Sequence, residues 1–88
     1  MPKIVITHPV VDVERWLKGK EERFAAISQF ATHVTDHAAT DGSNTTAITA
    51  DVHDMAGLQA LLASPSPELA AQMEAHGVLP PITVYIEK

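Results

Sequence analysis

The chain has no cysteine among its 88 residues. This absence excludes a disulfide framework, a thiolate metal site and a cysteine nucleophile. It also lacks any apolar run of the roughly 18 residues that a membrane-spanning helix needs, and its first residues show neither the basic region nor the long apolar stretch of a signal peptide. We therefore expect no membrane association and a cytoplasmic location.

Basic residues are also scarce, with six Lys and Arg against eleven Asp and Glu and a formal net charge of -5. Lys18, Lys20 and Arg23 alternate with Glu21 and Glu22, so they form no stripe that could neutralise phosphates, and we expect no nucleic-acid partner. A Gly-rich phosphate loop, a nucleophile elbow and a calcium loop are missing from the sequence too. Nucleotide-dependent chemistry is therefore not expected.

The length and the hydrophobic fraction of 45% predict one globular domain over residues 1–88. A chain of this size buries only about 60 to 65% of its unfolded surface. Its core is thin, and a second copy of the chain would add apolar burial. Size alone thus favours a homodimer.

The first half of the chain predicts strand, helix and strand. The β-branched run within Lys3–His8 indicates a strand that ends at a proline. Asp12 is suited to capping a helix over residues 12–28, which Gly19 weakens or bends. Residues 30–39 also fit a helical stripe, but their threonines and Val34 favour a strand, and a helix from Asp12 to residue 39 would be too long for this domain.

The second half predicts strand, helix, break, helix and strand. A turn at residues 40–44 leads into a strand over residues 45–50, so two strands form a hairpin. Asp51 or Asp54 caps the next helix, Ser64–Pro67 interrupts it, and glycine ends the second piece at residues 76–77. Residues 82–86 form the last strand. The order is βαββαβ, an α+β, ferredoxin-like fold with a four-stranded antiparallel sheet.

Several segments resemble small dimeric α/β-barrel proteins. They are His8-Pro-Val-Val-Asp-Val-Glu-Arg-Trp16, Ala50-Asp-Val-His-Asp54, Leu62-Ala-Ser-Pro-Ser-Pro-Glu68 and Gly77-Val-Leu-Pro-Pro-Ile-Thr-Val-Tyr85. This resemblance spans nearly the whole chain and implies a homodimer whose two sheets enclose an apolar to mixed cavity. The superfamily includes antibiotic-biosynthesis-monooxygenase-like and cyclase-like proteins, cofactor-independent quinol monooxygenases, muconolactone-isomerase-like enzymes and haem-binding proteins. Such a fold does not fix a reaction by itself.

Five histidines form the sharpest chemical signal, since histidine is the commonest side chain for proton transfer near neutral pH. The topology brings His8, His33, His53 and His76 to one end of the sheet. Loops there span about 15 to 20 Å, whereas a metal ion needs nitrogens about 2 Å away, so we expect no metal. On a strand, His33 and His37 share a face about 13 Å apart, which is typical of polar residues on a half-exposed sheet.

Three residues could contact a ligand in the expected cavity. His8 could act as a general base if its ring points between the two sheets; alternatively it is a strand-end histidine with a structural hydrogen bond. Trp16 could shape the ligand pocket or simply fill the core. Tyr85 should face the dimer cavity with Thr83, as a ligand contact or as interface packing. Near residue 53, helix capping accounts for both aspartates that flank the histidine.

Two functions follow from this resemblance and these residues. The first is a small-molecule-binding protein, as a cofactor-independent monooxygenase or a cyclase/isomerase for an aromatic or polyketide-like substrate. His8, His33 or His37 would then be catalytic, Trp16 and Tyr85 would bind the ligand, and no cofactor would be needed. Haem binding would need an axial histidine beside a large apolar pocket. The second is a non-enzymatic ligand-binding or stress-associated dimer with structural histidines.

Overall fold

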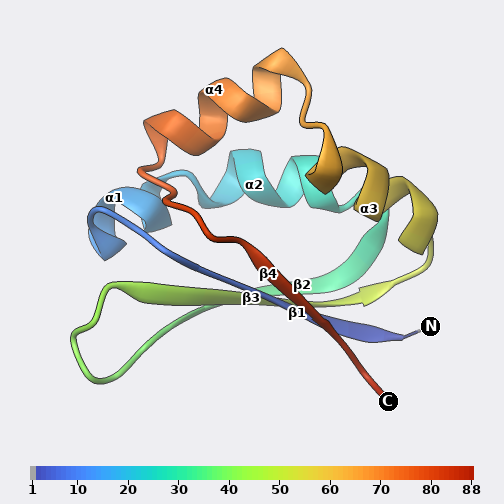
Figure 1. Ribbon diagram of the computed structural model, residues 1–88, viewed down its shortest axis with the longest axis horizontal. Coiled ribbons are helices and arrows are strands. Elements are labelled where there is room, and N and C mark those ends of the chain that lie inside the picture. The colour runs from blue at the N-terminus through green and yellow to red at the C-terminus, as the bar shows by residue number, and fades with distance from the viewer. Residues whose placement is uncertain (1) are drawn as a thin grey trace.

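A computed structural model describes residues 2–88 and contains four strands and four helices (Figure 1). In chain order they are β1 (Lys3–Pro9), α1 (Val13–Lys18), α2 (Lys20–Ile27), β2 (Ala31–Ala38), β3 (Thr45–Val52), α3 (Met55–Ala63), α4 (Pro67–Ala75) and β4 (Thr83–Ile86). The strands form one antiparallel sheet in the order β2-β3-β1-β4. All four helices lie on one side of this sheet, and the other side is open (Figure 1). The predicted ferredoxin-like α+β fold is confirmed.

Strand alternation decides which side chains lie under the helices. In β1, Ile4, Ile6 and His8 are buried, while the residues between them are only half-buried. The register places Ile6 opposite Ile48 and His8 opposite Thr46, so the buried positions of β3 lie on the same face. Because successive side chains point to opposite faces, every second residue of these strands belongs to the helix-covered core.

A bulge in β2 changes the face on which its later residues lie. Thr32 pairs with Asp51 and Thr35 with Thr49, so β2 has one more residue than β3 over this interval. His33, with a φ of 55°, is at this irregularity. An extra residue resets the alternation of a strand. Asp36 therefore lies opposite Ile48, on the face that the helices cover.

The first predicted helix is two helices, separated at Gly19. The Gly19 N–H donates to the Trp16 carbonyl at 3.1 Å, which tightens the last turn of α1, and α2 starts at the next residue. The ring of His76 lies directly against Gly19, and a β-carbon at this position would collide with it. The break thus lets a distant residue approach the backbone, which is a role suited to glycine.

Helix ends follow the capping signals in the sequence. The carboxylate of Asp12 accepts from the Arg15 N–H, and Asp54 accepts from the Gly57 N–H at 3.0 Å. Of the two aspartates offered for α3, Asp54 is the cap, because β3 continues through residue 52 and includes the other. Ser66 caps α4, and Gly77 follows it with a φ of 74°. The predicted caps at Asp12 and Asp54 and the predicted glycine stop at residue 77 are confirmed, because caps depend on nearby residues only.

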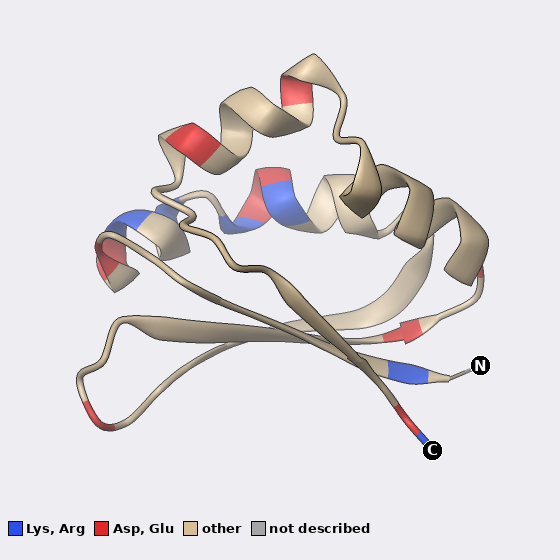
Figure 2. Ribbon diagram, in the orientation of Figure 1, with Lys and Arg blue, Asp and Glu red and all other residues tan. Residues whose placement is uncertain are grey.

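The core lies between the sheet and the helices. Its buried hydrophobic residues are Ile4, Ile6, Val10, Trp16, Ile27, Ala31, Ile48, Ala50, Val52 and Leu58. Within residues 2–88, no helix has both the length and the apolar character to cross a membrane. Charges of both signs lie on α2, whereas those on α4 are only acidic (Figure 2).

Candidate functional site

A small cavity of about 70 Å³ lies between the sheet and helices α2, α3 and α4. Most of its lining is aliphatic, from residues such as Ile6, Leu58 and Leu62. Four polar side chains also line it, and they come from different elements: His8, Arg23, Gln72 and His76. An apolar cavity with a few polar groups is the usual composition of a small-molecule site.

His8 lines this cavity, and only one of its two ring nitrogens has hydrogen-bond partners within residues 2–88. Its side chain is buried, with Nδ1 3.2 Å from the Pro9 carbonyl oxygen and 3.3 Å from the Thr46 hydroxyl. The Thr46 hydroxyl donates to the His8 carbonyl at 3.1 Å. Because a carbonyl can only accept, Nδ1 carries the proton, and Nε2 holds the lone pair. No hydrogen bond within residues 2–88 uses this Nε2.

Burial keeps this imidazole neutral. Desolvation lowers the pKa of His8 below 6.5, the nearby Arg23 charge lowers it further, and the hydrogen bond to Pro9 and the charge of Asp36 oppose the shift. A buried histidine resists protonation because the charged form loses its hydration. At neutral pH, His8 is therefore in the form that can accept a proton at Nε2.

Arg23 contributes a positive charge that is already paired. Its Nη2 donates to the Asp36 carboxylate at 2.6 Å, and Nη1 donates to the Trp16 carbonyl at 2.8 Å. Its guanidinium also lies 4.0 Å from the centroid of the Trp16 ring. Both members of the ion pair are more than 90% buried at the side chain. Arg23 thus forms a rigid wall of the cavity.

His76 links the cavity to the surface. It follows the last turn of α4, is buried, and places Nε2 3.7 Å from a carboxylate oxygen of the exposed Glu22. The topology predicted His8 and His76 at one end of the sheet, and both line this cavity. His53 does not line it and is exposed.

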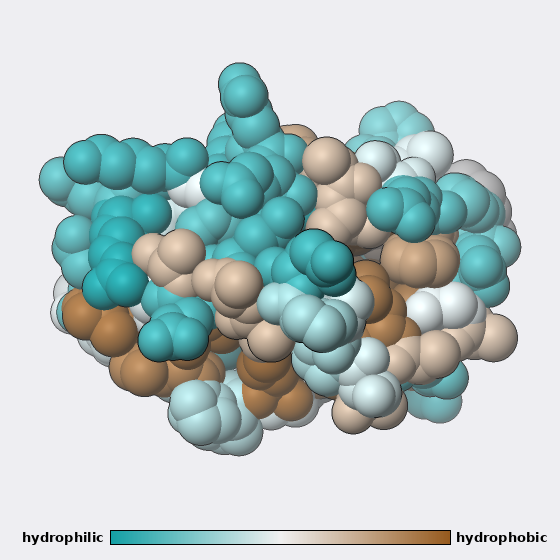
Figure 3. Space-filling model, turned by 90° about the horizontal axis from the view of Figure 1, so that it is seen from above, coloured by the Kyte–Doolittle hydropathy of each residue, from teal (hydrophilic) through white to brown (hydrophobic). Residues whose placement is uncertain are grey.

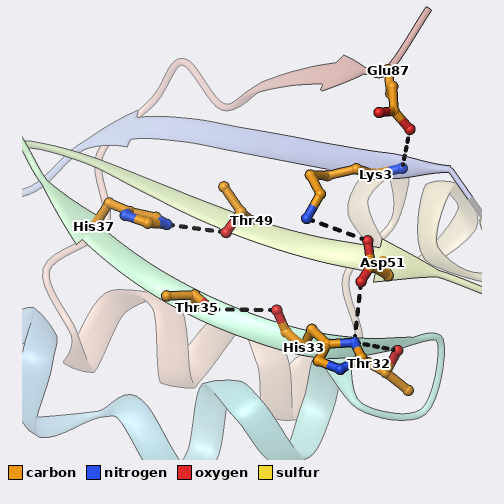
Figure 4. Close-up of polar contacts among 8 residues, drawn as sticks. All are labelled: Lys3, Thr32, His33, Thr35, His37, Thr49, Asp51 and Glu87. Carbon is orange, nitrogen blue, oxygen red and sulfur yellow. Dashed lines mark hydrogen bonds and ion pairs between the residues drawn. The ribbon is translucent and has the colours of Figure 1, made fainter.

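His33, His37 and Tyr85 lie on the opposite, open face of the sheet. His37 Nε2 is 3.0 Å from the Thr49 hydroxyl, and His33 Nδ1 is 3.1 Å from the Asp51 carboxylate (Figure 4). Tyr85 pairs with Val5 and is 56% exposed. Within one chain these residues share no site with His8.

This arrangement decides the direction of His8. The sequence left two alternatives open for its ring, the space between two sheets or a structural strand-end position, and in the structure the ring lies beneath the helices, because it follows Ile4 and Ile6 in the buried alternation of β1. Trp16 also belongs to the core: it is fully buried and meets the edge of the His8 ring at a centroid distance of 5.8 Å. It stands behind the cavity wall as a packing residue.

Three residues of this region were not predicted from the sequence: Arg23, Asp36 and Gln72. The spacing of Trp16, Arg23 and Ile27 could have predicted that Arg23 is buried. These residues are seven and four apart, which is typical of one helix face, and all three are buried. Asp36 carried no such signal, because the bulge that buries it is not visible in the sequence. Within residues 2–88, no group of three or more potential metal ligands is arranged to hold an ion.

The lowered pKa of His8 predicts weaker stability in acid. Below pH 6.5 the unfolded chain protonates this histidine while the folded chain does not, so the free energy of unfolding should fall as pH falls through this range. We expect urea midpoints measured between pH 8 and 5 to show this slope. His8→Asn should flatten it, and an unchanged slope in that variant would contradict the assignment.

Comparisons with known proteins identify the fold. No protein-family model matches the chain, and no curated protein matches it. Three solved structures align over nearly all of it. One, an antibiotic biosynthesis monooxygenase, has 11% identity and a TM-score of 0.68, with 100% of this chain and 97% of that chain covered.

The other two structures give the same result. A candidate antibiotic biosynthesis monooxygenase from Bordetella bronchiseptica has 10% identity, a TM-score of 0.72, and coverage of 99% of this chain and 94% of that chain. One from Deinococcus radiodurans has 13% identity, a TM-score of 0.61, and coverage of 100% and 91%. Identities this low establish structure rather than chemistry. Over its whole length, this chain has the ferredoxin-like α+β fold of antibiotic biosynthesis monooxygenase structures.

Proposed function

We propose that this protein binds an uncharged aromatic or polyketide-like molecule whose reacting group enters the cavity beneath the helices, and that His8 removes a proton from that group. One observation carries the proposal: a buried, neutral imidazole lines a mostly aliphatic cavity, and no hydrogen bond within residues 2–88 uses its Nε2. General bases need this combination of protonation state and position. The names of the structural neighbours, antibiotic biosynthesis monooxygenases, agree with a proton abstraction that precedes reaction with oxygen.

Such a reaction needs no bound cofactor. His8 Nε2 accepts a proton from an acidic C–H or O–H of the substrate, and the resulting anion reacts with molecular oxygen. With anthrone as substrate, anthrone and O2 would give anthraquinone and water, so one oxygen atom enters the product and the other leaves as water. An isomerase or cyclase would begin with the same proton transfer and would consume no oxygen.

Binding can be tested with the chain's own fluorophore. Trp16 is the only tryptophan, and it contacts both His8 and Arg23 at the cavity wall. We expect 1-naphthol to change Trp16 fluorescence in a saturable way. Leu58→Phe, which fills the cavity from α3, should weaken this response, whereas Gln59→Leu on the exposed side of α3 should not. A response without saturation would rule out a binding site here.

We also propose that two copies associate through the open sheet face. This face carries the half-buried, uncharged side chains of Val5, Thr7, Ala47 and Thr49 beside the exposed Tyr85. Its charges gather at one end, where Lys3 pairs with Asp51 and the Lys3 N–H donates to Glu87 (Figure 4). Uncharged side chains at the centre and charges at the rim are typical of interfaces.

Light scattering after gel filtration would test this association. We expect twice the chain mass of 9.5 kDa for the wild type and for Tyr85→Phe. Tyr85→Asp should give the mass of one chain, because a dimer of this variant would bury an unpaired carboxylate at its interface. A wild-type monomer at micromolar concentration would contradict the proposal.

A further inference from the structure

A groove on the outer surface runs between α2 and α4. It has a volume of about 480 Å³, and Phe30 and Leu61 contribute apolar surface to it. Viewed from the helix side, apolar surface is visible between hydrophilic parts of the helix layer (Figure 3). Glu22 and Glu68 also line the groove.

The groove and the inner cavity share a wall one side chain thick. Ala26, Leu61, Leu69 and Gln72 line both spaces. Two of these residues belong to α4, a helix that has no fully buried residue and follows the break at residues 64–66. Small movements of Leu69 and Gln72 would therefore join the two spaces.

The volumes of the inner cavity and the groove determine where a ligand can fit. At about 70 Å³, the inner cavity is smaller than an engineered cavity of roughly 150 Å³ that holds one benzene. A ligand with two fused rings cannot fit there alone. Together with the groove, the space falls in the range of about 300 to 1,000 Å³ that is common for small-molecule sites. A ligand of this size must therefore cross the wall.

Gln72 provides a recognition element at this wall. Its Oε1 is buried and accepts no hydrogen bond within residues 2–88. A buried acceptor without a partner is unfavourable, and a ligand hydroxyl or N–H at the wall would satisfy it. The carboxylates of Glu22 and Glu68, with the net charge of -5, disfavour an anionic ligand.

We propose that the groove and the cavity form one elongated site, reached between α2 and α4, for an uncharged ligand of two or more rings. The ligand carries an acidic group toward His8 and a separate hydrogen-bond donor that Gln72 accepts. This inference rests on the proposed binding function and specifies its substrate class. It differs from a site confined to the inner cavity, which at about 70 Å³ is too small for a whole aromatic ligand.

A matched pair of probes tests the role of Gln72. Using Trp16 fluorescence, 1,5-dihydroxynaphthalene is compared with 5-methoxy-1-naphthol, which has one donor fewer. We expect wild-type protein to prefer the diol by about five- to tenfold. Gln72→Leu should abolish the preference, while Gln59→Leu, at an exposed position of α3 outside both spaces, should retain it. His8→Asn should also retain it, because both probes keep one hydroxyl for His8.

The access route is tested at Ala25, which is exposed and lines the groove but not the cavity. Stopped-flow mixing should show that Ala25→Phe slows association of the diol by several-fold, whereas Ala71→Phe on α4, outside both spaces, leaves it unchanged. Absence of diol binding to the wild type would overturn both this inference and the proposed function. Normal binding by Ala25→Phe and an unchanged preference in Gln72→Leu would overturn this inference alone.

Discussion

His8→Asn is expected to lower the rate of oxygen uptake with anthrone by about 10²- to 10⁴-fold, the usual contribution of a general base. Asparagine can keep a donor toward the Pro9 carbonyl, where Nδ1 of His8 now lies at 3.2 Å, but it has no counterpart of Nε2. The substitution therefore removes the base while keeping the local hydrogen bond. An oxygen electrode measures the rate, and saturable binding of 1-naphthol would show that the variant's cavity is intact.

The histidines of the open face supply the matched controls for this experiment. His37→Asn and His33→Asn should keep the wild-type rate, because both residues lie on the face away from the cavity. A rate lost in His37→Asn but kept in His8→Asn would move the reaction to the space between two sheets.

The pH dependence of the reaction rate gives a second test of His8 as the base. Since the pKa of His8 is lowered, the wild-type rate should stay level down to pH 6.5 and fall only below it.

Asp36→Leu is expected to cost about 3–5 kcal/mol of folding free energy, because it leaves the Arg23 charge buried without its partner. The two side chains are 8% and 3% exposed, so water cannot replace the lost carboxylate. The total free energy of unfolding of a small domain is about 5–15 kcal/mol, so the variant should be close to unfolding at 37 °C. Urea denaturation followed by circular dichroism measures the loss.

A double variant separates an uncompensated charge from lost packing. Arg23→Met with Asp36→Leu should recover most of the loss, since an apolar pair can replace a buried ion pair. It would still lack the stacking of Arg23 on Trp16, which contributes about 1–2 kcal/mol. Lys3→Met, at the exposed pair with Asp51, should change stability by less than about 1 kcal/mol. Equal stability of Asp36→Leu and the double variant would contradict this explanation.

Local signals in the sequence predicted most of the secondary structure. The strand at Lys3–Pro9, the hairpin around residues 40–44, the break at Ser64–Pro67 and the caps at Asp12 and Asp54 all follow from the chemistry of neighbouring residues. The helix predicted for residues 12–28 is divided, because Gly19 meets His76, a residue that is distant in sequence. A contact of this kind has no local signature.

The candidate site was predictable only in part. His8 was identified because it matches the pattern of the family that the chain resembles, but the face on which its ring lies was left open. That face depends on which side of the sheet the helices cover. Gln72 and His76 come from the last third of the chain, and they line the same cavity as His8 only because α4 folds back over the sheet (Figure 1).

The sequence by itself determined the order of the elements, their caps and the absence of thiol chemistry, because each of these depends on residue type and short spacing. The tertiary structure alone decided that Asp36 meets Arg23, that His8 lies under the helices, and that its partners at the cavity are Gln72 and His76. A one-residue bulge at His33 reverses the alternation of β2 and so buries a carboxylate. Pairing between strands, rather than any local pattern, fixes such a register.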